Sequence, residues 1–280
     1  MGGKVDVYID VASLYSYVTF YYLLQNEDVL AAHGVQIESV SFPFPKNPNL
    51  QTVVYAASIP FFLAPLMQLL VSNPDHLSPL PFTLSTGNKP PWTLPAKANY
   101  GTYDAQRSCA RVGKPNITPP ANFMERSMTV LPLRALHYIK KNYPFSTYQT
   151  TWHWVLHCFW EPPHRNITKP DVLVKVLADA PQQYPAPQGA VAKLFSEADV
   201  KKIMEGATSQ DIKDALKSKT QEAIDRGAFG APWLWAVNDQ GAAEPFFGSD
   251  RFHFLYDFLG VPYQDIAILA PGTSKKDAKL

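Results

Sequence analysis

Residues 4–24 read KVDVYIDVASLYSYVTFYYLL, and this stretch decides the fold. From Lys4 to Ile9, β-branched residues alternate with polar or aromatic ones, which is the period-2 pattern of a strand. From Ser13 onward the chain is almost continuously apolar and opens with a serine, which is typical of a buried helix behind an N-cap. The stretch therefore predicts a strand, a tight turn and a helix.

The next segment completes a βαβ unit. Gly34 ends a helical pattern, and Val35–Phe42 reads as a second strand. Because a helix connects the two strands, we expect them to pair in parallel.

The far end of the chain predicts a hairpin and a helix. Residues 231–237 and 244–247 are strand-like, and Asn238-Asp239-Gln240-Gly241 between them has turn composition. An amphipathic pattern then begins at Gly248-Ser249-Asp250 and runs to Gly260. The chain thus ends in a ββα unit.

Between these units the sequence is mostly helical, with capping-box patterns at residues 196–199 and 208–211. A βαβ unit, a helical middle and a ββα unit predict an α/β fold, a thioredoxin-like domain with an inserted all-helical domain. We assign residues 1–86 and 215–265 to the thioredoxin-like domain, which carries an apolar insertion at 47–74. Residues 87–214 form the inserted helical domain and residues 266–280 the C-terminal tail.

The amino-acid composition excludes several classes of function. The 280 residues are 46% hydrophobic and 18% charged with a formal net charge of +1, which argues against disorder and against nucleic-acid binding. The two cysteines, Cys109 and Cys158, form no Cys-x-x-Cys pair and no zinc-site spacing. We therefore expect no metal site and no disulfide framework.

The stretch from Asn47 to Pro74 has no charged residue. A membrane span at residues 53–71 would place the two halves of one sheet on opposite sides of a bilayer, and Pro60 and Pro65 interrupt a helix there, so we expect no transmembrane span. Burial in the core or at a dimer contact is the expected role. A wall of a hydrophobic substrate pocket and contact with a membrane surface are the alternatives.

The chain closes with Ala278-Lys279-Leu280, a variant of the peroxisomal tripeptide Ser-Lys-Leu, and its N-terminus lacks the apolar core of a signal peptide. A peroxisomal location is the expectation, with mitochondrial and cytoplasmic locations as alternatives. A solvated basic terminus is the plainer interpretation of the same residues.

Ser13-Leu14-Tyr15-Ser16 occupies the strand-to-helix turn where disulfide-exchanging thioredoxin relatives carry Cys-x-x-Cys. Without cysteines, disulfide exchange through these positions is excluded. A hydroxyl at a helix N-terminus can stabilise an anion, so Ser13 can donate a hydrogen bond to a thiolate. An ordinary helix N-cap is the alternative role.

Three further motifs can bind a peptide-like thiol. Ala231-Pro232 enters a strand where this fold carries a cis-proline, which would expose the backbone of Ala231 for pairing with a ligand. Gly248-Ser249-Asp250 offers backbone N–H groups and a carboxylate. The loop at residues 87–91, followed by Lys97, offers a cation for a carboxylate. Strand entry, helix capping and surface solvation are the respective alternatives.

In this order and spacing, these motifs resemble the kappa-class glutathione transferases over about the whole chain. The resemblance implies that Ser13 contacts the glutathione sulfur, that glutathione is the co-substrate and that a hydrophobic electrophile is its partner. It also implies a homodimer without metal. It places glutathione binding on residues of the matching motifs, namely Tyr15, Ser16, Asn88, Lys97, Ala231, Pro232, Ser249 and Asp250.

The sequence departs from the family pattern at Leu14, Tyr17 and Ala231 and in its apolar insertion. The changes at Leu14 and Tyr17 affect the acceptor side, where we expect the electrophile to lie against Tyr15, Tyr17 and Trp233. The insertion bears on the range of substrates. The 2-hydroxychromene-2-carboxylate isomerases, which share the serine and glutathione, are the alternative enzyme class. A non-catalytic glutathione-binding or interaction protein is the third hypothesis.

Overall fold

The computed structural model describes residues 2–41, 94–115, 117–186 and 192–264. Four of the sequence predictions fall outside these residues. They are the apolar insertion at 47–74, the domain boundary at 86/87, the glutathione-binding role of Asn88 and the tail with Ala278-Lys279-Leu280. No helix in the described ranges is both long and apolar enough to cross a membrane.

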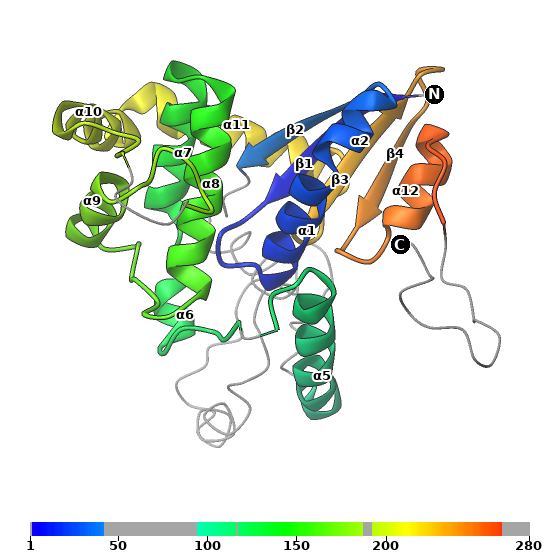
Figure 1. Ribbon diagram of the computed structural model, residues 1–280, viewed down its shortest axis with the longest axis horizontal. Coiled ribbons are helices and arrows are strands. Elements are labelled where there is room, and N and C mark those ends of the chain that lie inside the picture. Colours follow the sequence, from blue (N-terminus) through cyan, green and yellow to red (C-terminus); the bar gives the residue numbers. More distant parts are fainter. Residues whose placement is uncertain (1, 42–93, 116, 187–191, 265–280) are drawn as a thin grey trace.

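The described strands form one four-stranded mixed sheet with the order β2-β1-β3-β4 (Figure 1). β1 (Gly3–Ile9) pairs in parallel with β2 (Val35–Ser41) and antiparallel with β3 (Trp233–Asn238), and β3 pairs antiparallel with β4 (Ala243–Phe247). The predicted βαβ unit and the predicted hairpin therefore share one sheet. This arrangement confirms the thioredoxin-like fold.

Helices pack on both faces of the sheet. α1 (Leu14–Gln25) and α2 (Glu27–Ala32) follow β1, and α12 (Phe252–Leu259) follows β4. Alternation along β1 directs Val5 and Val7 into a core shared with α1 and α12, and directs Tyr8 to the opposite face, where it packs near Ala223 of α11 and Trp233.

Most of the inserted helices gather beside β2, whereas α5 (Pro95–Arg111) lies against α1 (Figure 1). In chain order the inserted helices are α5, α6 (Phe123–Arg126), α7 (Val130–Asn142), α8 (Phe145–Trp160), α9 (Pro170–Ala178), α10 (Glu197–Thr208) and α11 (Gln210–Asp225). The predicted domain boundary at 214/215 falls inside α11, which packs against both α7 and β2.

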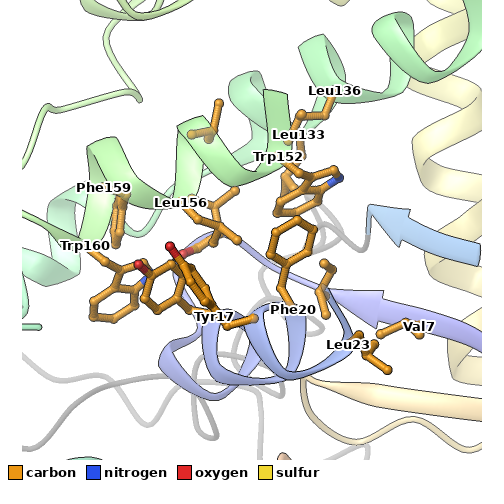
Figure 2. Close-up of a cluster of buried hydrophobic side chains, with 14 of the residues drawn as sticks. Val7, Tyr17, Phe20, Leu23, Leu133, Leu136, Trp152, Leu156, Phe159 and Trp160 are labelled. Atoms are coloured by element: carbon orange, nitrogen blue, oxygen red, sulfur yellow. The ribbon is translucent and has the colours of Figure 1, made fainter. Parts of the chain in front are cut away.

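An aromatic core joins α8 of the insert to α1 (Figure 2). Trp152, Phe159 and Trp160 of α8 are fully buried, and the rings of Trp152 and Phe20 lie 6.4 Å apart. Each buried aromatic side chain removes about 150–250 Å² from water, so this contact fixes α1 firmly against the insert.

Two predicted helix starts are wrong in detail. α12 begins at Phe252 behind Arg251, so Ser249 and Asp250 lie in the turn before the helix. α11 is preceded by Ser209 because α10 continues through Thr208, so residue 208 is not an N-cap. At Ser196 the predicted capping box is present, with reciprocal hydrogen bonds to Asp199.

Candidate functional site

Ser13 lies at the N-cap of α1, as its sequence position predicts. Its Oγ accepts a hydrogen bond of 3.1 Å from the backbone N–H of Ser16, which satisfies one of the free donors at the helix start. The side chain has no solvent exposure. The hydroxyl thus sits at the positive end of the α1 dipole, which favours a negative charge.

The same hydroxyl reaches across the molecule to Ala231. Ser13 Oγ donates to the carbonyl oxygen of Ala231 at 3.0 Å, which joins the first turn of α1 to the residue two positions before β3. The Ala231–Pro232 peptide bond is cis, as predicted. The structure therefore brings Ser13, Ser16, Ala231 and Pro232 together, although more than 200 residues separate the two pairs along the chain.

Ser16 is buried and stabilises the turn between β1 and α1 through its side chain. It has no solvent exposure, and its Oγ accepts from the backbone N–H of Asp10 at 3.3 Å. The N–H of Ser13 in turn donates to the carbonyl of Asp10 at 3.1 Å. These bonds hold the residues from Asp10 to Ser16 in one compact turn, and the hydroxyl of Ser16 faces the protein interior.

Asp10 is a fully buried acid behind this turn. Its Oδ1 accepts a hydrogen bond of 2.7 Å from the hydroxyl of Thr129, which directly precedes α7. Burial raises the pKa of the Asp10 carboxyl to about 7, and the Thr129 hydroxyl and the N–H groups of Ala12 and Val11 oppose the shift.

Two further side chains connect the turn to α8. Trp160 Nε1 donates to the carbonyl of Val11 at 2.7 Å, and the hydroxyl of Tyr17 donates to Glu161 at 2.7 Å. Glu161 also accepts from Lys114 at 2.8 Å. Hydrogen bonding from His157, then from Lys114 and Tyr17, lowers the pKa of Glu161 to about 2 against the opposing effect of burial.

The structure contradicts the expectation that Tyr17 and Trp233 contact the electrophilic substrate. Tyr17 is fully buried between α1 and α8, where it contacts the ring of Tyr21 and bonds to Glu161 (Figure 2). Trp233 is 4% exposed and packs against Phe229 and Phe247. Neither side chain presents a surface to a second substrate, because each points into a packed cluster.

Tyr15 is half-buried between α1 and α5. Its hydroxyl donates to Asp104 of α5 at 2.5 Å, and its pKa is raised by burial, by this carboxylate and, more weakly, by the charge of Asp250. Lys97 is exposed on the first turn of α5, on the same helix as Asp104.

The turn before α12 is anchored to Pro232. The N–H of Gly248 donates to the carbonyl of Pro232 at 3.1 Å. Gly248 adopts φ +94°, and a Cβ there would meet Oδ1 of Asp250 at 2.8 Å, so the turn requires glycine. Ser249 is half-buried, and the exposed Asp250 forms an ion pair with Arg251.

The two cysteines are poorly suited to redox chemistry, because both thiols are buried. Cys109 and Cys158 are buried, and burial raises the pKa of each thiol to about 12. A thiol with so high a pKa carries almost no thiolate at neutral pH. Among the described residues no group of three or more acidic, histidine or cysteine side chains could hold a metal ion.

Sequence reasoning missed the groups by which the insert holds the turn. Thr129 lies 119 residues from Asp10, and Trp160 lies 149 residues from Val11. No local pattern signals such contacts. The one available signal was Asp10 itself, an acid inside an apolar strand-to-turn segment, since a buried carboxyl requires a partner.

Comparison with known proteins agrees with this architecture. Over 271 residues the chain is 25% identical to glutathione S-transferase kappa 1 of Caenorhabditis elegans, covering 92% of each chain. Over 67 residues it is 37% identical to glutathione s-transferase kappa 2 of the same organism, covering 24% of this chain and 30% of the relative.

Solved structures share the fold at low sequence identity. A 2-hydroxychromene-2-carboxylate isomerase matches with a TM-score of 0.54 and 17% identity, over 92% of this chain and 94% of that one. A putative protein disulfide isomerase from Nitrosomonas europaea matches with a TM-score of 0.50 and 10% identity, over 92% and 97%. The model of the DSBA-like thioredoxin domain matches residues 76–260, more than half of the sequence, and the chain belongs to this family.

Proposed function

We propose that this chain binds glutathione and acts as a kappa-class glutathione transferase in which Ser13 donates a hydrogen bond to the reacting sulfur. One observation carries the proposal: the Ser13 hydroxyl lies at the N-terminus of α1 and within 3.0 Å of the Ala231 carbonyl. A helix N-terminus stabilises a thiolate, and the backbone before β3 can pair with a peptide-like ligand. The similarity to glutathione S-transferase kappa 1 along 92% of both chains supports the assignment.

The charges around this turn complement those of glutathione, which carries two carboxylates and one ammonium group. Asp250 offers a carboxylate to the ammonium group, and the N–H groups of the Gly248–Asp250 turn suit the neighbouring carboxylate. Lys97, exposed on α5, offers a cation to the other carboxylate. The ligand would then extend along Ala231 with its sulfur toward Ser13.

The proposed chemistry begins with loss of the thiol proton to solvent. The Ser13 hydroxyl and the α1 N-terminus stabilise the resulting thiolate, which lowers the pKa of the thiol. The sulfur electron pair then forms a bond to the electrophilic atom of the second substrate, and the leaving group departs with its bonding pair. A hydrophobic electrophile such as an aryl halide fits this step.

The Ser13 hydroxyl has one proton, which it donates to Ala231 in this structure. Donation to a sulfur requires the O–H to turn away from that carbonyl, while the bond from the Ser16 N–H can persist. The sulfur and the Ala231 carbonyl thus compete for one donor. Since Ser13 has no solvent exposure, binding of the sulfur also requires a local rearrangement.

The decisive assay measures glutathione consumption with an aryl halide, a hydroperoxide and a chromene carboxylate. We expect consumption with one of the first two, and its loss in Ser13→Ala. Isomerisation of the chromene carboxylate without net consumption would assign the alternative isomerase function. Glutathione binding without any turnover would instead indicate an interaction protein.

Assembly and location are separate parts of the proposal. We expect a homodimer, which light scattering of the purified chain measures directly. We also expect peroxisomal location through Ala278-Lys279-Leu280. A fluorescent protein ending in these residues should enter peroxisomes, and a reporter without them should stay outside.

A further inference from the structure

The carboxyl group of Asp10 has no role in the proposed reaction, yet it is completely enclosed. Its side chain has no solvent exposure, Oδ1 accepts from Thr129, and Oδ2 has no hydrogen-bond partner among the described residues. A buried, ionised carboxylate with an unpaired oxygen is strongly disfavoured, whereas the protonated acid is tolerated. The geometry therefore favours the uncharged form of Asp10.

Asp10 also closes a chain of hydrogen bonds around Ser13. The Ser13 N–H donates to the Asp10 carbonyl at 3.1 Å, the Asp10 N–H donates to Ser16 Oγ at 3.3 Å, and the Ser16 N–H donates to Ser13 Oγ at 3.1 Å. On its other side, the carboxyl of Asp10 bonds to Thr129 of the insert. Asp10 is thus a direct connection between the inserted helices and the turn that carries the Ser13 hydroxyl.

We propose that Asp10 is a positioning residue of the sulfur site, which ties the helical insert to the Ser13 turn and acts as the uncharged acid. This inference rests on the proposed function, because it concerns a sulfur bound at Ser13. The uncharged acid holds the turn without placing a negative charge beside the thiolate. An ionised Asp10 repels the thiolate and raises the pKa of the bound thiol. Burial raises the pKa of Asp10 to about 7, so the acid is mostly uncharged below neutral pH and ionises above it.

The neighbouring ionisable groups do not alter this conclusion. On the elements around the turn they include Tyr15 and Tyr17 of α1, Asp104 of α5, Arg134 of α7, and His157 and Glu161 at the end of α8. The groups that shift the pKa of Asp10 are instead the Thr129 hydroxyl and two backbone N–H groups, besides burial itself. The charge state of Asp10 is therefore set locally.

The test compares the wild-type chain with Asp10→Asn, Asp10→Ala and Thr129→Val. Asparagine mimics the uncharged acid, alanine removes the connection, and valine removes the partner hydroxyl while keeping the side-chain shape. Asp179→Asn, at an exposed ion pair, and Thr151→Val, at a buried helical hydroxyl, are the matched controls. For each folded protein, the ultraviolet absorbance of bound glutathione thiolate is titrated against pH, and turnover is measured.

Asp10 ionises as the pH rises above about 7 and then opposes the thiolate. We therefore expect Asp10→Asn to lower the apparent pKa of the bound thiol by about one unit, and to keep turnover within about threefold near pH 6, where Asp10 is uncharged. Asp10→Ala should lose turnover about 10- to 100-fold, and Thr129→Val about 3- to 10-fold, with the controls unchanged. An unaltered thiol titration in Asp10→Asn together with full turnover in Thr129→Val would overturn the inference. If the wild-type chain forms no bound thiolate, the proposed function fails instead. If Asp10→Ala does not fold, Asp10→Asn and Thr129→Val still test the inference.

Discussion

The hydroxyl of Ser13 donates a hydrogen bond of 3.0 Å to the carbonyl of Ala231, 218 residues further along the chain. This bond connects the start of α1 to the entry of β3, at the point where the two halves of the thioredoxin-like domain meet. The serine therefore has a structural partner in the ligand-free chain and a proposed catalytic partner in the bound sulfur. Substitutions can separate the two roles.

Ser13→Ala should lower turnover roughly tenfold to a thousandfold, because it removes the donor to the thiolate. Ser196→Ala is the matched control, since Ser196 also caps a helix through its side chain but lies on α10. Both substitutions should lower the free energy of unfolding by about 1 kcal/mol, the usual cost of a lost N-cap. Steady-state kinetics and thermal unfolding measure the two effects. Equal turnover in the two variants would leave Ser13 a helix cap only.

Asp10 should make the chain less stable as the pH rises. Its pKa in the folded chain, about 7, lies above the ordinary value of 3.8, so between these values the folded state binds more protons than the unfolded state. The contribution of the uncharged acid is complete below about pH 4 and is lost as the pH rises through 7, at up to about 1.4 kcal/mol per unit. Unfolding in denaturant at pH 5 and pH 8 should show this loss in the wild-type chain and a smaller one in Asp10→Asn. Equal pH dependence in the two proteins would contradict it.

Glu161 should act in the opposite direction at acid pH. Its pKa in the folded chain, about 2, lies below the ordinary value of 4.5, so its contribution is complete above 4.5 and is lost as the pH falls toward 2. Glu161→Gln keeps the shape but weakens the bonds from Tyr17 and Lys114. We expect a loss of about 1–2 kcal/mol in unfolding free energy at pH 7 and a smaller loss at pH 3, where part of the contribution of Glu161 has already gone. A loss independent of pH would instead indicate a packing defect.

Asp250 should affect binding of glutathione more than its conversion. Asp250→Asn removes an exposed charge from the proposed ammonium site, and exposed ion pairs contribute little, so KM should rise about two- to fivefold. Turnover at saturation should change less than twofold, because the group is remote from the sulfur. Asp179→Asn, on the distant α9 side, is the control. A fall in kcat with KM unchanged would assign Asp250 to the chemical step.

The parts of the fold with a local signal could be predicted from the sequence. Alternation in residues 4–9 and the serine at position 13 predict β1 and the start of α1, and turn composition at 238–241 predicts the hairpin. The helix after the hairpin was placed too early because Ser249 and Asp250 resemble capping residues, whereas the chain first completes a turn at Gly248. Local composition does not distinguish these two arrangements.

The contacts that complete the site depend on long-range packing. Thr129 directly precedes α7 and Trp160 is the last residue of α8, and the patterns of both helices predict only burial. Their bonds to Asp10 and Val11 arise from how the insert packs against the turn that carries Ser13. The same packing turns Tyr17 inward, which the sequence interpretation assigned to the acceptor side. A helical pattern shows which face is apolar but not which element covers it.

The most direct test of the central claim is the pKa of the thiol of bound glutathione, measured by ultraviolet titration of the wild-type chain and Ser13→Ala. We predict a pKa one to two units below that of free glutathione in the wild-type chain, equivalent to about 1.4–2.8 kcal/mol of preferential thiolate stabilisation. At least half of that lowering should disappear in Ser13→Ala, while glutathione still binds. A bound thiol with the pKa of free glutathione, or the same lowered value in both proteins, would contradict the role of Ser13.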